Sequence, residues 1–106
     1  MLSWDEFSKM ELVVAEIKDV KEHPNADRLY LLTVDLGTEQ RQLVAGIRAA
    51  YDKEDLLGKK VVVVANLQPA VIRGEESRGM ILAASDGDRL AVVSPERDVR
   101  AGARVR

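Results

Sequence analysis

Polar side chains that could contact a ligand gather between residues 66 and 80. Asn66 and Ser77 could hydrogen-bond a base or a backbone group, and Arg73 could contact a phosphate. Met80 could pack against a base or a sugar. A structural explanation also fits, in which Asn66 and Ser77 satisfy loop backbone groups and Met80 joins the core. The segment therefore indicates nucleic-acid recognition, with a purely structural role as the alternative.

Residues that could catalyse a reaction do not form a recognisable set. The single histidine, His23, could act as a general base, but it stands beside Pro24 with Asp27 nearby, which favours a role in a turn. Glu75 occupies the place where a nucleophile elbow around Ser77 needs glycine. Cysteine is absent and histidine is single, which excludes thiolate nucleophiles, disulfides and histidine or cysteine metal clusters. We expect no catalysis and no cofactor.

The charges of the 106-residue chain are unevenly distributed. It has 16 Lys and Arg and 18 Asp and Glu, and this net charge of −2 argues against a general phosphate-coating protein. Residues 1–40 hold 4 basic and 9 acidic side chains, whereas residues 41–82 hold 7 and 5. The polar segment thus lies in a basic part of the chain. Folding could assemble a modest basic patch from Arg41, Arg48, Lys59, Lys60, Arg73 and Arg78.

Apolar patterning predicts the elements that position this segment. The expected strands cover residues 11–22, 29–36, 42–47, 59–67, 80–84 and 90–93. We expect a bulge near Ala15–Glu16 in the first strand, and a polar loop around Gly74 over residues 73–78.

Two short helices complete the prediction. Ser3 and Glu6 fit a capping box at the start of the first, and Asp52 to Gly58 fit one helical turn between the third and fourth strands. Because an OB-fold has a helix at that point, we predict the all-β class: a five-stranded OB-fold barrel with extra C-terminal strands. The first residues carry acids early and the longest apolar run is Val61 to Ala65, so neither a signal peptide nor a membrane span is expected. We expect one cytoplasmic domain over residues 1–106.

Several motifs, spread in order along nearly the whole chain, carry a family resemblance. They are His23-Pro24-Asn25-Ala26-Asp27-Arg28-Leu29-Tyr30, Val44-Ala45-Gly46-Ile47, Asn66-Leu67-x-Pro69 and Ser77-x-Gly79-Met80-Ile81-Leu82-Ala83-Ala84. Together they resemble the tRNA-binding domain family. That family includes stand-alone tRNA-binding proteins, the C-terminal domain or β subunit of methionyl-tRNA synthetase, and the cytokine-like synthetase cofactors of eukaryotes.

The resemblance implies an OB-fold that binds tRNA by shape, near the elbow and without chemistry of its own, with a methionyl-tRNA synthetase catalytic chain as a partner. Carried over by position, the tRNA contacts are Asn66, Arg73, Ser77 and Met80, with Arg28 and Arg41 as basic support. Many relatives have a cation where this chain has Val13, Gln68, Ala70 and Val71. Each lost cation removes roughly one phosphate contact, so we expect weaker and less salt-dependent binding. A protein-interaction or chaperone-like module of the same fold is the alternative.

Both ends of the chain suggest contacts between copies. Trp4 and Phe7 are three residues apart on the first helix and would pack in a core or an oligomer interface. The tail Ser94-Pro95-Glu96-Arg97-Asp98-Val99 with Gly102 is similar to family members that dimerise through their C-terminal strands. We expect a homodimer, with Trp4, Phe7, Pro95 and Val99 at its interface and residues 95–106 as the dimerisation segment.

Overall fold

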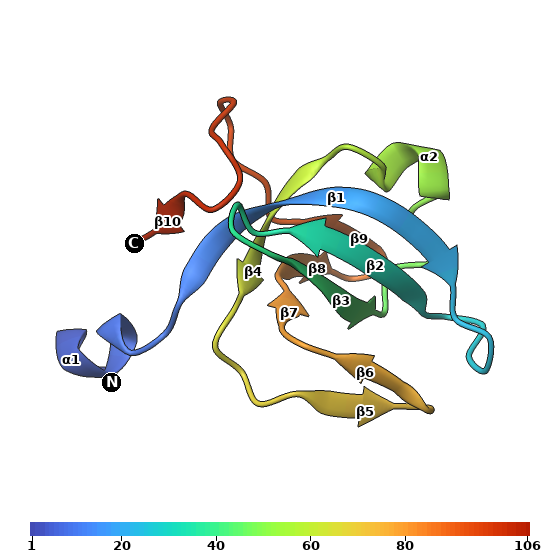
Figure 1. Cartoon of the computed structure of the whole chain (residues 1–106), viewed down its shortest axis with the longest axis horizontal. Coiled ribbons are helices and arrows are strands. Elements are labelled where there is room, and N and C mark those ends of the chain that lie inside the picture. The colour runs from blue at the N-terminus through green and yellow to red at the C-terminus, as the bar shows by residue number, and fades with distance from the viewer.

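The structure, a computed structural model, describes residues 1–106 as a chain built mostly of strands (Figure 1). Its two short helices are α1 (Trp4–Ser8) and α2 (Lys53–Leu56). The strands are β1 (Leu12–Glu22), β2 (Tyr30–Asp35), β3 (Gln40–Ala45), β4 (Lys60–Val64), β5 (Ala70–Ile72), β6 (Glu75–Ser77), β7 (Met80–Ile81), β8 (Ala83–Asp86), β9 (Arg89–Val92) and β10 (Arg104–Val105). No helix is long and apolar enough to cross a bilayer.

The main sheet has the antiparallel order β3-β2-β1-β4-β7. The long strand β1 pairs with β4 along its first half and with β2 along its second half, so it curves through both sides of the sheet. The segment after β6 returns to β3, where the Arg78 N–H donates to the Gln42 carbonyl at 2.9 Å. The sheet is thereby a nearly closed five-stranded barrel, and the predicted fold class is confirmed.

The barrel interior is filled from alternate positions of β1, β2 and β3 and from β4. The largest fully buried side chains are Ile17, Leu32, Leu43, Leu56, Val34, Val61 and Val63. Strand β4 buries both of its faces, because a second cluster of Leu12, Val62 and Val64 covers its outer side beneath Phe7, Leu82 and Val105. Burial on two faces explains its uninterrupted valines.

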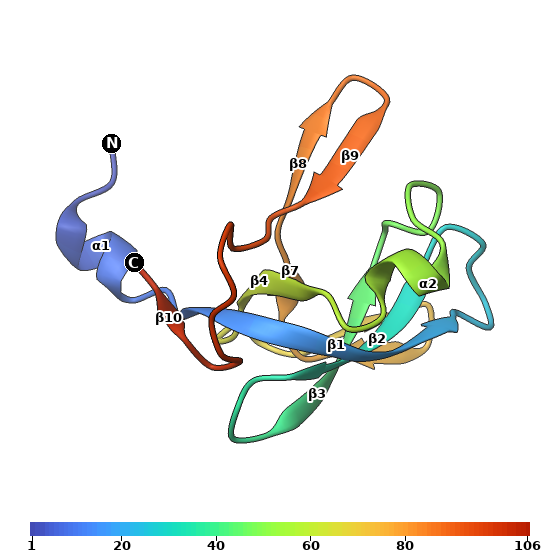
Figure 2. The same cartoon turned by 90° about the horizontal axis from the view of Figure 1, so that it is seen from above.

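Three additions surround the barrel. The β5–β6 hairpin lies along the flank formed by β3, and the β8–β9 hairpin extends away from the barrel (Figure 2). Strand β10 pairs with the start of β1 and lies beside α1, so both ends of the chain meet (Figures 1 and 2). A Cβ on Gly102 would stand 2.7 Å from the Leu36 carbonyl oxygen, and only glycine permits that approach of the C-terminal segment to the β2–β3 turn.

Both predicted helix starts are confirmed. The Ser3 hydroxyl accepts from the Glu6 N–H and the Glu6 carboxylate accepts from the Ser3 N–H, each at 3.1 Å. Asp52 is the N-cap of α2, and Gly58 follows that helix with a φ of 84°.

Three details of the strand prediction are wrong. The bulge expected near Ala15–Glu16 is absent there, since these residues pair regularly with β4. The irregularity of β1 lies instead between Ile17 and Asp19, where its pairing with β2 shifts. Residues 73–78 are not a loop: Arg73 and Gly74 form the two-residue turn of the β5–β6 hairpin, both with positive φ. The strand expected over 80–84 divides at Leu82, where the chain changes its partner from β4 to β9.

Candidate functional site

The predicted contact residues lie along the chain that leaves the barrel after β4 and returns at β7. This segment, residues 66–79, contains the β5–β6 hairpin, whose turn reaches the β1–β2 loop, residues 23–29. The hairpin is held on its other side by β3, because the Gln42 side-chain amide donates to the Glu76 carbonyl at 2.9 Å. The segment therefore runs from the barrel end where β4 stops to the opposite end, at the β1–β2 loop, and its polar residues lie on one flank.

Asn66 joins the end of β4 to the chain between α1 and β1. Its Oδ1 accepts from the Glu11 N–H at 2.8 Å and its Nδ2 donates to the Lys9 carbonyl at 2.7 Å. These bonds are the structural role that the sequence allowed. The side chain is exposed, and its amide keeps one hydrogen and one lone pair for a ligand.

Ser77 is buried in the barrel wall, with 4% of its surface exposed. Its hydroxyl accepts from the Val44 N–H at 3.0 Å and donates to the Gly79 carbonyl at 2.9 Å. The Ser77 hydroxyl thus accepts the Val44 N–H bond that a backbone carbonyl of β6 would accept in a regular pairing with β3. In this position Ser77 reaches an external ligand only if β6 leaves β3.

Met80 is 47% exposed, so the core position that the sequence also allowed is wrong. Its side chain borders a shallow groove of about 310 Å³ between the barrel and the β8–β9 hairpin. The groove is lined by Val44, Ala45, Gly46, Ile47, Met80, Ile81, Leu82, Ala83 and Leu90. An exposed thioether on an apolar floor can pack against a base, a sugar or an apolar side chain.

The arginines divide into paired and unpaired groups. Arg28, Arg73 and Arg78 are exposed and form no ion pair. Arg73 is oriented by the bond from its Nη2 to the Asn25 carbonyl, at 3.1 Å. Arg73 lies at the hairpin turn, Arg28 on the adjoining loop and Arg78 directly after β6, so these three are the unpaired positive charges that the site can offer to a ligand.

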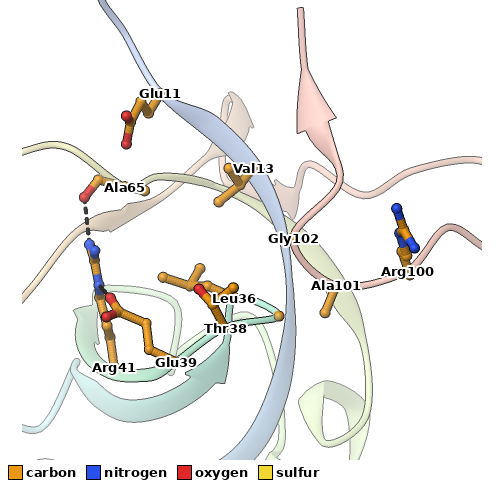
Figure 3. Close-up of a pocket in the computed structure, with 11 residues that line it drawn as sticks. Glu11, Val13, Leu36, Thr38, Glu39, Arg41, Ala65, Arg100, Ala101 and Gly102 are labelled. Atoms are coloured by element: carbon orange, nitrogen blue, oxygen red, sulfur yellow. Dashed lines mark hydrogen bonds and ion pairs between the residues drawn. The ribbon is translucent and has the colours of Figure 1, made fainter.

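Arg41 is half-buried and occupied by the barrel itself. It forms an ion pair with Glu39 and donates to the Ala65 carbonyl, as Figure 3 shows, and to the Arg78 carbonyl at 3.3 Å. In the predicted basic patch, Arg48 and Lys60 are also ion-paired, with Glu22 and Asp98. The patch is therefore smaller than its sequence suggests.

The largest hollow, about 590 Å³, opens beside Arg41 between the β2–β3 turn and the C-terminal segment (Figure 3). Its charged lining is Glu11, Glu39, Arg41 and Arg100, which sum to zero, and Val13 forms part of its wall. A balanced lining gives no net attraction for a polyanion. The hollow thus adds little to the cationic surface of the hairpin.

The remaining positions with an expected cation are on the surface. Gln68, Ala70 and Val71 are all exposed, and Val71 reaches 73%. A cation at any of them would face solvent on the hairpin, so its absence lowers the charge of this flank directly.

The predicted interface residues lie in two places. Trp4 is 69% exposed and contacts Phe7 with ring centroids 5.7 Å apart, beside a hollow of about 220 Å³ that Val105 also lines. Pro95 and Val99 lie in another loop, where the Lys60 ammonium donates to the Val99 carbonyl at 2.7 Å. The exposed aromatic surface is therefore on α1, beside β10.

The sequence did not predict the contact between the β1–β2 loop and the hairpin. His23 stabilises its own turn as expected, since its Nδ1 accepts from the Asn25 N–H at 2.9 Å. Its Nε2 also bonds the Ile72 carbonyl at 2.9 Å, 49 residues away. The only signal for such a link was a histidine directly after a long apolar strand.

Comparisons with known proteins agree with this architecture. Residues 12–104 match the profile of a family described as "Putative tRNA binding domain". The methionine–tRNA ligase of Thermococcus kodakarensis is 55% identical over 105 residues, which are 99% of this chain and 14% of that protein. The chain thus spans a small part of the ligases that it matches.

Two solved structures share the fold over the whole chain. The crystal structure of a MetRS-related protein from Pyrococcus horikoshii has a TM-score of 0.92 and 35% identity, covering 99% of this chain and 97% of that one. The crystal structure of the CsaA chaperone protein from Picrophilus torridus has a TM-score of 0.93 and 28% identity, covering 100% of both chains.

Proposed function

The chain belongs to the tRNA-binding domain family, and on that premise we propose that it is a binding module that recognises tRNA by shape and charge. The observation that carries this proposal is the set of exposed, unpaired guanidinium groups on the segment 66–79 and the neighbouring β1–β2 loop: Arg28, Arg73 and Arg78. Guanidinium forks suit phosphate oxygens, and folded RNA is recognised mainly through its backbone.

The number of available cations sets the expected strength. Three phosphate contacts at about 0.7 to 0.9 each give a slope of roughly −2 to −3 in log affinity against log salt concentration. Since the net charge is −2, the surface as a whole does not attract RNA. Binding is therefore local to the hairpin flank and of moderate affinity.

The module acts as an appended part of a methionyl-tRNA synthetase or as a separate subunit that raises its affinity for tRNA. The high identity to a small part of methionine–tRNA ligases supports this role. Pairing of two copies through Trp4 and Phe7 would double the cationic surface. In sedimentation, Trp4→Ala should lower the mass from dimer to monomer, whereas Leu57→Ala, which removes another exposed apolar side chain, should not.

Filter binding with tRNA at two salt concentrations tests the function. We expect binding at low salt, and Arg73→Ala should weaken it about tenfold and reduce the salt slope by about 1. Arg97→Ala is the matched control, since Arg97 is exposed and unpaired but outside the hairpin. Failure of the folded protein to bind at low salt contradicts the proposal, and equal losses in both variants contradict the site.

A chaperone-like module that binds extended apolar peptides is the second candidate, favoured by the groove beside Met80 and by the likeness to a CsaA chaperone protein. Ala83→Glu places a charge in that groove and should abolish peptide binding. Anisotropy of a labelled apolar peptide measures it. Absence of peptide binding by the unsubstituted protein removes this candidate.

A further inference from the structure

His23 is a buried side chain in an exposed loop. Only 3% of its surface is exposed, whereas Pro24, Asn25 and Arg28 are all exposed. Because a buried polar ring is costly without partners, its two ring nitrogens need explanation. Both are bonded, one within the loop and one to the β5–β6 hairpin.

The bonds fix the form of the imidazole. Nδ1 accepts from the Asn25 N–H, so it carries no hydrogen, and Nε2 then carries the ring hydrogen and donates to the Ile72 carbonyl. Ile72 is the last residue of β5, directly before the Arg73–Gly74 turn. A single side chain therefore links the loop that carries Arg28 to the turn that carries Arg73.

Asn25 strengthens the same link. Its Nδ2 donates to the Arg73 carbonyl at 3.3 Å, and the Arg73 guanidinium donates back to the Asn25 carbonyl at 3.1 Å. The bonds lie on both sides of the turn, so they define its position and orientation.

The hairpin depends on such bonds. Its strands have three residues each, and a two-stranded hairpin alone is marginally stable at best. Arg73 also has a φ of 54°, which costs a residue with a side chain about 1 to 2 kcal/mol. Few apolar contacts offset this cost, since Val71 is 73% exposed. Without the loop bonds, other turn conformations become competitive.

We propose that His23 is a positioning residue for RNA binding: its Nε2–H bond to the Ile72 carbonyl fixes the hairpin turn so that Arg73 stands at the β1–β2 loop, which carries Arg28, before RNA arrives. This inference rests on the proposed function, because it explains how the same cationic surface is organised. Ordering the arginine in advance removes part of the entropy cost of binding.

Two substitutions separate the bonds of His23. In His23→Gln the side-chain amide nitrogen lies near the position of Nε2 and keeps the bond to the Ile72 carbonyl. In His23→Asn the side-chain oxygen still accepts from the Asn25 N–H, but the bond to the Ile72 carbonyl is lost. We expect His23→Asn to lower tRNA affinity about tenfold and the salt slope by about 1, like Arg73→Ala, while His23→Gln stays within about threefold of the unsubstituted protein. Equal affinity losses in the two variants, each following its loss of thermal stability, would overturn the proposal.

A double-mutant cycle tests whether His23 acts through Arg73. The variant with both His23→Asn and Arg73→Ala should bind tRNA no more weakly than Arg73→Ala alone. Independent, multiplying losses would contradict a positioning role.

Amide hydrogen exchange without RNA keeps this inference distinct from the proposed function. Exchange at Ile72 and Glu75, which pair across the hairpin, should accelerate in His23→Asn and not in His23→Gln, with Asp86 and Arg89, which pair across the β8–β9 hairpin, unchanged as the control. If the unsubstituted protein fails to bind tRNA, the proposed function is wrong. The amide exchange rates still show whether the His23 bond fixes the hairpin turn. Unchanged exchange in His23→Asn contradicts the link itself.

Asn25→Ala covers the case in which His23→Asn does not fold. It removes an exposed amide and leaves the buried imidazole in place. We expect faster exchange at Glu75, which pairs with Ile72, and an affinity loss of about threefold, near the net value of one neutral hydrogen bond. Unchanged values of both quantities would overturn the proposal.

Discussion

The barrel and the β5–β6 hairpin are held by different forces. In the barrel, Ile17, Leu32 and Val63 are almost fully buried, and non-directional apolar burial dominates. The hairpin is held mainly by directional bonds from side chains to backbone, given by His23 on one side and Gln42 on the other. The apolar core and the candidate contact residues therefore lie in separate parts of this molecule.

This separation has a consequence for substitutions. Loss of apolar volume in the barrel changes the free energy of unfolding of the whole chain, because the barrel strands share one core. Loss of one bond at the hairpin changes a local equilibrium and leaves the core intact. Variants placed in each region, and between them, test this distinction.

Leu32→Ala should have the largest effect. Leu32 is 0% exposed at the centre of the barrel core, so its truncation should cost about 3 kcal/mol in the free energy of unfolding. Urea denaturation followed by circular dichroism measures this loss. A loss below about 1 kcal/mol would contradict the assignment of stability to the barrel core.

Ser77→Ala should have an intermediate effect, because Ser77 joins the two regions. Its removal leaves the part-buried Val44 N–H and Gly79 carbonyl without this partner, at about 2 kcal/mol. Ser85→Ala, at an exposed position of β8 with no side-chain hydrogen bond, is the control and should change stability by less than about 0.5 kcal/mol. Equal effects at the two serines would mean that β6 is not fixed to β3 by the hydroxyl.

The sequence predicted the barrel well because apolar burial leaves a periodic pattern. Alternation in residues 29–36 and the continuous valines of residues 61–64 reflect one buried face and two buried faces respectively. The boundaries moved by a few residues, since strand ends are set by hydrogen-bond partners that no local pattern contains. The helix caps, which are local, were also predicted correctly.

The candidate site was predicted less completely for the same physical reason. The β5–β6 hairpin has little apolar patterning, and its exposed Val71 suggests no strand. Its position depends on bonds across 49 residues from His23 and 34 residues from Gln42. Such contacts leave no periodic signal, so the sequence identified Arg73 by type but could not state what orients it.

Tyr30→Phe examines a polar group inside the barrel. The Tyr30 hydroxyl donates to the Tyr51 carbonyl at 2.7 Å, so its removal should cost about 1 kcal/mol at neutral pH. Burial, with a smaller contribution from Asp52, raises the pKa of Tyr30 above its ordinary value of 10.0. The folded state therefore holds this proton more tightly than the unfolded state, and the stabilisation is complete below about pH 10 and declines as pH rises through the folded pKa.

The difference in unfolding free energy between the two proteins should accordingly shrink in alkaline solution, as measured by urea titrations at neutral and alkaline pH. A difference that grows with pH would contradict the raised pKa and the polar burial inside the barrel.

Gln42→Ala should have the smallest effect on global stability and a clear effect on the hairpin. The side chain is half-exposed, so water replaces part of its bond to the Glu76 carbonyl, and we expect a loss of about 0.5 kcal/mol. Exchange at Glu75 and Glu76 should nevertheless accelerate, because the bond holds β6 to β3 without contributing to the core. Gln40→Ala, at the exposed start of the same strand, is the matched control and should alter neither quantity. If Gln42→Ala instead lowers global stability as much as Leu32→Ala, the hairpin is part of the cooperative core and the two regions are one.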